Sequence, residues 1–271
     1  MPRETIVSDF TDADKHHRTR KLAEYLEYVN NIPEIRGMKE RSYRHLGLRE
    51  GDAVLDPGCG SGYDAIRMAG MVGREGRVHG IDLNEQLLGI ARENAKGKDL
   101  PVSFEVQDIS RLDFPDESFD AIRLERTLQV LKDPGRALDE LVRVLKPSGR
   151  MVAVEPDWDT LVIDPGSRET EEAFFRFCND QFPDGSTGRK LYRYFKERDL
   201  KDVRVYPEPL LMHDFEPVFH LLNMKQFIMA AEEHGVIGHD ALAAWQQEMQ
   251  SASDAGRFTF AGLFFVATGR K

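Results

Sequence analysis

The chain has 271 residues, a formal net charge of −10 and two cysteines. An acidic chain lacks the broad basic face that binds phosphates, which disfavours a nucleic acid substrate. Two cysteines form no disulfide framework and suit a reducing compartment. The chain starts without an apolar signal core, and its longest apolar run, 263–267, is too short to span a bilayer. We therefore expect a cytoplasmic protein without a membrane span.

Predicted strands and helices alternate along the chain. A helical region reaches residue 46, and a strand at 53–56 then leads into a glycine-rich loop and a helix at 63–71. Further strands are predicted at 77–82, 102–107, 119–124, 151–155, 202–213 and 259–268, with helices such as 136–145 between them. This alternation predicts an α/β fold, a doubly wound and mostly parallel seven-stranded sheet with helices on both faces.

The most informative motif is VLDPGCGSG at 54–62, where three alternate glycines follow a strand. Glycines remove side chains that would block a close ligand, so Gly58, Gly60 and Gly62 predict a binding loop. Asp56 ends the strand as a hydrogen-bond acceptor. Asp82 ends the next strand, where a βαβ unit places a carboxylate beside a ribose diol. The GxGxG spacing differs from the GxGxxG of dinucleotide-binding proteins, which disfavours NAD.

These motifs resemble those of the class I S-adenosylmethionine-dependent methyltransferases, close to the branch that includes the ubiquinone and menaquinone C-methyltransferases. The resemblance covers roughly residues 45–155 and rests on four blocks: VLDPGCGSG, GIDLNEQLL, FEVQDISRLDFPDESFDAIRLERTLQVLKDP and ELVRVLKPSGRMVAVEP. Pro57 departs from the small or β-branched residue usual in the family. The resemblance implies a Rossmann-like fold, S-adenosylmethionine as cofactor and S-adenosylhomocysteine as product.

The resemblance also implies where the adenosine part of the cofactor lies. Asp82 would hold both ribose hydroxyls, because a carboxylate is a bidentate acceptor, and Leu83 would pack on the adenine face. Asp108 would accept from the adenine amino group, while the backbone N–H of Ile109 meets a ring nitrogen. An alternative role for Asp108 is to cap the turn before Ser110.

Two pairs of residues are candidates for the methionine part of the cofactor. Glu125 and Arg126, in the loop after the fourth strand, would meet its ammonium and carboxylate groups by resemblance, or would pair with other surface charges instead. Tyr25 and Arg20, on the N-terminal helix, would close over the cofactor as similar helices do, or would remain exposed residues without a specific role.

Three segments exceed what the sheet needs. We expect an N-terminal helical cap at 1–46 and a cofactor-binding domain at 47–271 with insertions at about 159–186 and 214–256. Both insertions leave from carboxyl ends of strands, where the ligand crevice of an open parallel sheet lies. The apolar segment 216–235 is therefore interpreted as a lid over an apolar substrate pocket. The alternatives are a core helix or the contact of a homodimer.

The candidates for a catalytic base follow from the same edge of the sheet. Glu155 and Asp157 come after the fifth strand and His213 ends the sixth, and a histidine titrates near neutrality. Each has a plainer alternative, as a structural or turn residue. No metal site is expected, since the adjacent His16 and His17 would point about 100° apart on a helix.

We therefore expect a methyltransferase that moves a methyl group from S-adenosylmethionine to a small, partly apolar O, N or C acceptor, mainly by proximity and alignment. One alternative is a non-methylating rearrangement or cyclisation on the same fold. Another is a non-catalytic partner subunit, which the intact set of Asp56, Gly58, Gly60, Asp82 and Asp108 disfavours.

Overall fold

The computed structural model describes residues 16–271, with side chains from Thr19 onward. One sheet carries seven strands in the order β3-β2-β1-β4-β5-β7-β6. The five strands from β3 to β5 pair in parallel, whereas β7 runs antiparallel to both β5 and β6. The predicted, mostly parallel α/β fold is therefore confirmed. The strands are β1 Ala53–Pro57, β2 Arg77–Asp82, β3 Val102–Val106, β4 Phe119–Glu125, β5 Leu145–Asp164, β6 Lys201–Met212 and β7 Thr259–Arg270.

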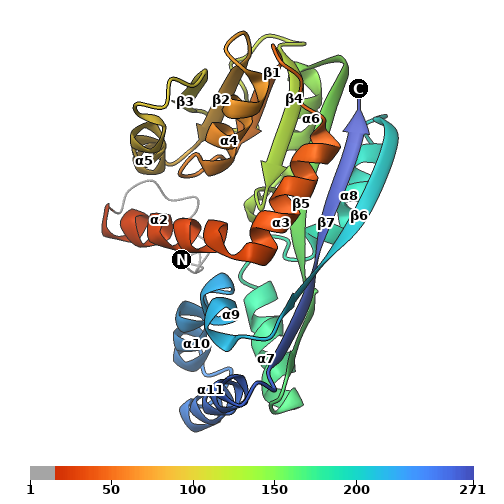
Figure 1. Ribbon diagram of the computed structural model, residues 1–271. Helices are drawn as coiled ribbons and strands as arrows, with labels where there is room; N and C mark the ends of the chain where they lie inside the picture. Colours follow the sequence, from red (N-terminus) through yellow and green to blue (C-terminus); the bar gives the residue numbers. More distant parts are fainter. Residues whose placement is uncertain (1–15) are drawn as a thin grey trace.

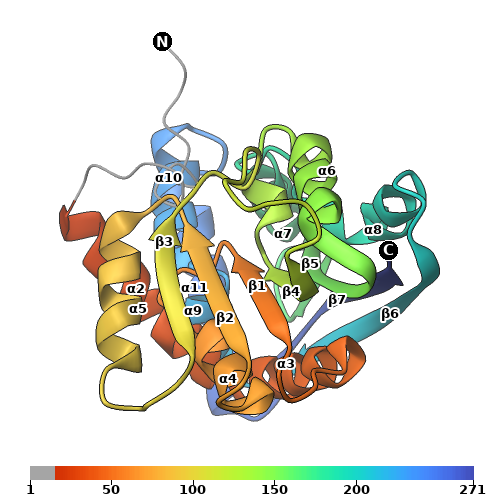
Figure 2. The same ribbon diagram turned by 90° about the horizontal axis from the view of Figure 1, so that it is seen from above.

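Helices cover both faces of the sheet because successive strand residues point to opposite sides. Val54 and Val152 belong to one buried apolar cluster, and their neighbours Leu55 and Ala153 belong to a second one. The first cluster packs under helices α3 Pro33–Leu46, α4 Tyr63–Val72 and α5 Glu85–Ala95, and the second under α6 Pro134–Val144 and α8 Thr187–Lys196. Figure 2 shows these two helical layers on either side of the strands.

The chain order of the strands reverses between β1 and β4. From β1 the chain moves outward through β2 and β3, and it then returns to the other side of β1 as β4 and β5. In sheets of this kind, the carboxyl ends of the strands at such a switch point form the ligand crevice. The glycine loop after β1 and the loop after β4, which leads into the 3-10 helix η1 Leu128–Val130, therefore lie side by side.

The last three strands are much longer than the others and continue past the edge of the parallel strands (Figure 1). Their extensions carry a second group of helices, which lies below the crevice in Figure 1. Helix α2 His16–Asn31 crosses in front and contacts α5 on one side and α9 on the other. The helices of this lower group are α7 Arg168–Asn179, α9 Phe215–Leu221, α10 Met224–Glu233 and α11 His239–Asp254.

Candidate active site

The three loop glycines turn the chain from β1 into α4. Gly58, Gly60 and Gly62 have φ angles of 74°, 52° and 79°, in the left-handed region that glycine adopts without steric cost. A Cβ atom on Gly58 would lie 2.5 Å from Thr127 Oγ1 in the loop after β4, and one on Gly60 would lie 3.2 Å from Leu26 of α2. The missing side chains therefore let two segments, the loop after β4 and helix α2, pack tightly against the glycine loop.

Asp82 ends β2 directly beside this loop. Its Oδ2 accepts a hydrogen bond from Gly60 N at 2.9 Å, and its Oδ1 accepts one from Asn84 N at 2.9 Å. Burial raises the pKa of Asp82, and the backbone N–H groups oppose that shift. Each carboxylate oxygen has a further lone pair. Asp82 and its neighbour Leu83 thus offer a fixed acceptor and an apolar surface to a molecule in the cavity.

A cavity of about 210 Å³ opens at the switch point, and its two ends differ in chemistry. The end nearest the parallel strands, here called the polar end, is lined by the glycine loop, Lys39, Asp64, Asp82, Glu125 and Arg126. The end nearest the lower helices, here called the apolar end, is lined mainly by apolar side chains. They are Trp158, Leu161, Phe182, Leu210, Leu222, Phe227, Phe260, Leu263 and Phe264.

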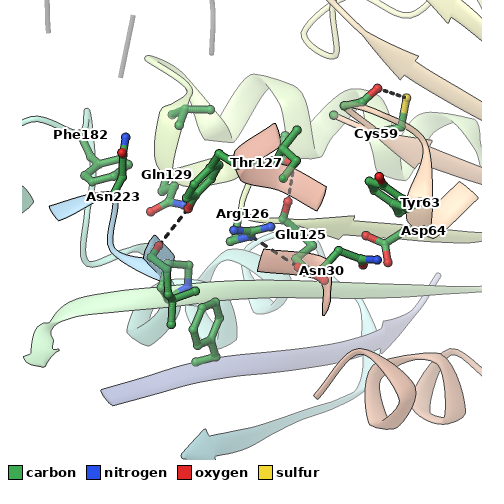
Figure 3. Close-up of a pocket in the computed structure, with 18 of the residues that line it drawn as sticks. Asn30, Cys59, Tyr63, Asp64, Glu125, Arg126, Thr127, Gln129, Phe182 and Asn223 are labelled. Carbon is green, nitrogen blue, oxygen red and sulfur yellow. Dashed lines mark hydrogen bonds and ion pairs between the residues drawn. The ribbon is translucent and has the colours of Figure 1, made fainter. Parts of the chain in front are cut away.

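Five charged side chains meet behind the polar end. Lys39 Nζ lies 2.6 Å from Asp64 Oδ2 and 3.3 Å from Glu125 Oε1. Arg123 is fully buried, with Nη1 at 3.3 Å from Asp64 Oδ2 and Nη2 at 2.5 Å from Glu125 Oε2. Arg126 Nε lies 3.4 Å from Glu125 Oε1 (Figure 3). Three cations thus face two carboxylates, and this group leaves one positive charge in excess beside the cavity.

Glu125 Oε1 is paired with two cations, Lys39 at 3.3 Å and Arg126 at 3.4 Å, but with the hydrogen-bond geometry of neither. Its side chain is 4% exposed, and no described residue donates a well-formed hydrogen bond to Oε1. Burial and the nearby Asp64 would raise the pKa of Glu125, but Lys39, Arg123 and Arg126 together outweigh them and hold the pKa below its usual range. A buried, ionised carboxylate oxygen requires a donor, and Glu125 lines the cavity from which one can come.

Glu155 of β5 shapes the loop that carries these groups. Its Oε1 accepts hydrogen bonds from Thr127 N at 2.8 Å and from Leu128 N at 2.7 Å. Burial raises the pKa of Glu155 to about 8. Arg126 itself has a φ of 53°, a strained conformation for a non-glycine residue. The buried carboxyl group therefore fixes the turn that brings Arg126 to the cavity.

Three aromatic rings form the wall of the apolar end. The ring centroid of Trp158 lies 4.9 Å from that of Phe182 and 5.8 Å from that of Phe227. Trp158 Nε1 also donates a hydrogen bond to Gln129 Oε1 at 3.1 Å. Among the described residues, none that lines this end carries an ionisable side chain. An apolar molecule would therefore find packing there but no acid or base.

None of the three expected bases lines the cavity, and the structure corrects their position. The prediction assumed that the fifth and sixth strands end at the crevice, but β5 and β6 continue beyond it. Glu155 and Asp157 consequently lie inside β5, where Asp157 is buried in a two-pronged ion pair with Arg189. His213 is exposed after the far end of β6, with Nδ1 at 3.1 Å from the Phe258 carbonyl oxygen.

Most residues predicted to bind the cofactor line the cavity, with two departures. Asp56 is 3% exposed beneath the glycine loop, and burial and the nearby Asp64 raise its pKa well above the usual value. Asp108 is exposed, and its Oδ1 accepts hydrogen bonds from the N and Oγ atoms of Ser110, both at 2.8 Å, as in the alternative capping role. The predicted residues that do line the cavity are Gly58, Gly60, Asp82, Leu83, Ile109, Glu125 and Arg126.

Of the two candidate residues on α2, the structure places only one at the cavity. Tyr25 lines the cavity, and its hydroxyl donates a hydrogen bond to the Leu221 carbonyl oxygen at 3.0 Å. Arg20 is exposed and pairs with Glu24 on the same helix at 3.1 Å. Tyr25 thus ties the N-terminal helix to α9 across the cavity, whereas Arg20 does not reach it.

Comparison with known proteins agrees with this geometry. The family described as "Methyltransferase domain" matches residues 48–199, more than half of the chain. The chain belongs to the class I S-adenosylmethionine-dependent methyltransferases. This methyltransferase is 32% identical to an uncharacterized 37.1 kDa protein in transposon TN4556 of Streptomyces fradiae, over 91% of this chain and 70% of that protein. It is 30% identical to the demethylmenaquinone methyltransferase of Geobacillus kaustophilus, over 67% of this chain and 76% of that protein.

Solved structures share the fold of this methyltransferase. Phosphoethanolamine N-methyltransferase 2 of Haemonchus contortus, in complex with S-adenosyl-L-methionine, superposes with a TM-score of 0.62 at 20% identity, covering 98% of this chain and 60% of that one. The cyclase SpnF superposes with a TM-score of 0.53 at 22% identity, covering 88% of this chain and 80% of that one. At this level of identity, the similarity defines the architecture and leaves the reaction to the residues of the site.

The sequence analysis missed three residues of this methyltransferase that line the apolar end: Gln129, Trp158 and Phe182. Trp158 and Phe182 come from the predicted insertion at 159–186 and the strand before it, where no local pattern shows which side chains face inward. For Trp158, the one sequence feature that could have suggested a site was its place between two aspartates. Gln129 lies four residues after Glu125, so its place in the same loop could have suggested it.

Two further observations concern residues 16–271 alone. No helix in this part of the methyltransferase is long and apolar enough to cross a membrane. No group of three or more possible metal ligands gathers among the described side chains. The side chains of His16 and His17, which were considered as ligands, lie outside the described ones.

Proposed function

We propose that the enzyme transfers a methyl group from S-adenosylmethionine, bound at the polar end, to a small and partly apolar molecule bound at the apolar end. The observation that carries this proposal is that a single cavity joins the two ends. The polar end suits a charged nucleoside and the apolar end an apolar acceptor, so both reactants would meet inside one cavity.

The polar end fits the cofactor group by group. Asp82 would accept from the ribose hydroxyls, since each of its oxygens keeps a lone pair beyond its 2.9 Å backbone contact. Leu83 and Ile109, which line the cavity, would cover the adenine. The buried Glu125 Oε1, which has ion pairs but no well-formed hydrogen bond from the described residues, would receive the ammonium group, and Arg126 would face the carboxylate.

The cofactor supplies a methyl group on a sulfonium, which is already an electrophile. The chain then has three tasks, which are to align the acceptor with that methyl group, to hold both reactants and to exclude water. Tyr25, which is hydrogen-bonded to α9, and the aromatic wall both line the cavity. The described residues of the apolar end carry no base, which favours an acceptor whose attacking atom is nucleophilic without proton removal by the protein.

A small acceptor also agrees with the relatives and with the shape of the site. Demethylmenaquinone, the substrate in the names of several relatives, is a ring compound that an apolar wall would suit. The lower helices contribute to the wall of the cavity, and the net charge of −10 disfavours a nucleic acid substrate. We propose a small, partly apolar molecule with a ring that the apolar end can hold.

A cyclisation or rearrangement of an apolar molecule is the second candidate. The same lack of ionisable groups at the apolar end favours it, because such reactions need shape more than acid or base chemistry, and SpnF shares the fold. The two reactions differ in what happens to the cofactor. Methyl transfer consumes it, whereas cyclisation leaves it intact.

Incubation with S-adenosylmethionine and a panel of phenols and hydroxynaphthalenes, whose hydroxyl protons can be lost to water, followed by mass spectrometry, tests the proposal. We expect one product that is heavier by a methylene group, formed in equal amount with S-adenosylhomocysteine. An isomerised product without S-adenosylhomocysteine would instead establish the second candidate. Failure of the folded protein to bind either sulfur nucleoside would contradict both and support a non-catalytic partner subunit.

A further inference from the structure

Gln129 is the polar exception where the two ends of the cavity meet. It belongs to η1, and only 5% of its surface is exposed, yet it lines the cavity. Its backbone is held on both sides, since Glu155 Oε1 accepts from Leu128 N at 2.7 Å and the Gln129 carbonyl oxygen accepts from Asp184 N at 3.3 Å. Figure 3 shows its side chain beside Arg126 and Asn223. The amide is therefore fixed in place at the junction.

The orientation of this amide is decided by Trp158. The indole Nε1–H is only a donor, and it lies 3.1 Å from the amide oxygen of Gln129. The opposite amide orientation would set two donors against each other, so the oxygen must face Trp158. The amide nitrogen Nε2 then points away from Trp158, and its two N–H groups remain available as donors. No described residue accepts a hydrogen bond from it.

An unmatched donor in such a place calls for a partner from the ligand. The adjoining rings of Trp158, Phe182 and Phe227 offer no strong acceptor, and among the described contacts Asn223 bonds Gln226 at 2.8 Å and not Gln129. Nε2 is accessible from the cavity, where water can accept from it, and a ligand that displaces this water must replace its hydrogen bond or bind more weakly. A cationic amine would bring only further donors to this point.

We propose that Gln129 Nε2 donates a hydrogen bond to the methyl acceptor, and that the acceptor therefore carries a carbonyl, hydroxyl or phenolate oxygen on an apolar, ring-sized body. This inference rests on the proposed function and specifies its substrate class. Gln129 fixes the oxygen, the aromatic wall holds the ring, and Trp158 positions Gln129. The site thereby selects oxygen-bearing rings over hydrocarbons and over cationic amines.

A matched pair of probes tests this inference without knowledge of the natural acceptor. Acetophenone carries a carbonyl oxygen that only accepts hydrogen bonds, and α-methylstyrene has nearly the same shape with a methylene group in its place. Affinities are measured by ligand-observed NMR, with the protein saturated with S-adenosylhomocysteine. One neutral hydrogen bond predicts that the wild type binds acetophenone about fivefold more tightly than α-methylstyrene. Benzylammonium should bind more weakly than both.

Two variants assign the preference to Gln129. Gln129→Glu keeps an oxygen for Trp158 and replaces the free donor by an acceptor, so the preference for acetophenone should vanish or reverse. Gln129→Leu should lose the preference while keeping the affinity for α-methylstyrene. The control, Gln250→Leu on the exposed face of α11, should behave as wild type. The affinity for S-adenosylhomocysteine should remain unchanged in all three variants.

The outcomes separate this inference from the proposed function. Equal binding of acetophenone and α-methylstyrene to the wild type, or a preference that survives in Gln129→Glu, would overturn the role of Gln129 and leave the apolar end as the acceptor site. Binding of neither probe to a wild type that is loaded with S-adenosylhomocysteine would overturn the acceptor site itself and the inference with it.

Discussion

The two ends of the cavity are built by different means. The polar end comes from short loops at the edge of the parallel strands, and each of its groups is held by a buried ion pair or a backbone hydrogen bond. The apolar end comes from extended strands and added helices, which are held by ring packing. The comparison indicates that ion pairs and hydrogen bonds fix the geometry of the polar end. The shape of the apolar end, in contrast, can change when one apolar side chain replaces another.

The largest effect is expected where the polar end is anchored. Arg123→Leu would remove a cation that pairs with both Asp64 and Glu125 and would leave these carboxylates buried. The free energy of unfolding, measured by urea denaturation, should therefore fall by about 3–5 kcal/mol. In the control Arg74→Leu, the lost ion pair with Asp99 is 85% exposed on both sides, and the change should stay below about 1 kcal/mol. Similar losses in both variants would refute an electrostatic anchor.

Tight closure of the glycine loop predicts the next largest effect. Gly58 and Gly97 share a φ of 74°, but a Cβ on Gly58 would meet Thr127 at 2.5 Å, whereas nothing lies within 4 Å of one on Gly97. Gly97→Ala should cost about 1–2 kcal/mol of backbone strain, and Gly58→Ala about 1–3 kcal/mol more. Thermal unfolding measures both. Equal losses would mean that the loop is not closely packed.

Glu155 holds the loop that leads into η1, between the two ends of the cavity. Its raised pKa predicts that the free energy of unfolding depends on pH. Its pKa of about 8 in the folded protein exceeds the ordinary value of 4.5, so between these values the folded state keeps a proton that the unfolded state releases. The free energy of unfolding should therefore fall as pH rises, by about 1.4 kcal/mol per pH unit near pH 6–7.

Glu155→Gln isolates this contribution, because the amide retains the acceptor for Thr127 and Leu128 and does not titrate. Urea denaturation of both proteins at pH 6 and pH 7 should show a steeper fall for the wild type. Parallel pH profiles would show that Glu155 is ionised in the folded protein.

At the apolar end we expect a smaller and more selective effect. Trp158→Phe keeps a ring in the wall but removes the N–H that orients Gln129. The affinity for acetophenone should fall by about two- to fivefold, and the affinity for S-adenosylhomocysteine should not change. An equal loss for both ligands, in the same NMR and calorimetric titrations, would mean that the two ends are not independent.

The difference between the ends also explains what the sequence could and could not predict. Gly58, Gly60 and Asp82 follow strands directly, and strand order alone brings them together, so local motifs located them. Trp158 and Phe182 reach the cavity only because β5 continues past the crevice and its register with β7 shifts after Asp157. No local pattern encodes such an extension, and the same extension placed the expected bases elsewhere.

The seven strands were predicted with small shifts at their ends, since each combines apolar residues with turn signals. The fifth strand is the exception at both ends, because it was predicted at 151–155 and β5 runs from Leu145 to Asp164. Asp108 shows a different limit. Its motif resembles a cofactor contact, but the turn it caps has satisfied Oδ1 locally through Ser110, and only coordinates distinguish the two roles.

Isothermal titration with S-adenosylhomocysteine tests most directly whether the polar end holds the cofactor. Asp82→Asn removes the charge that would bind the ribose hydroxyls, whereas Asp99→Asn changes an aspartate that is exposed and distant from the cavity. We expect tight binding by the wild type and by Asp99→Asn, and an affinity reduced at least about tenfold in Asp82→Asn. Equal affinity in all three proteins, or no binding by the folded wild type, would contradict this assignment.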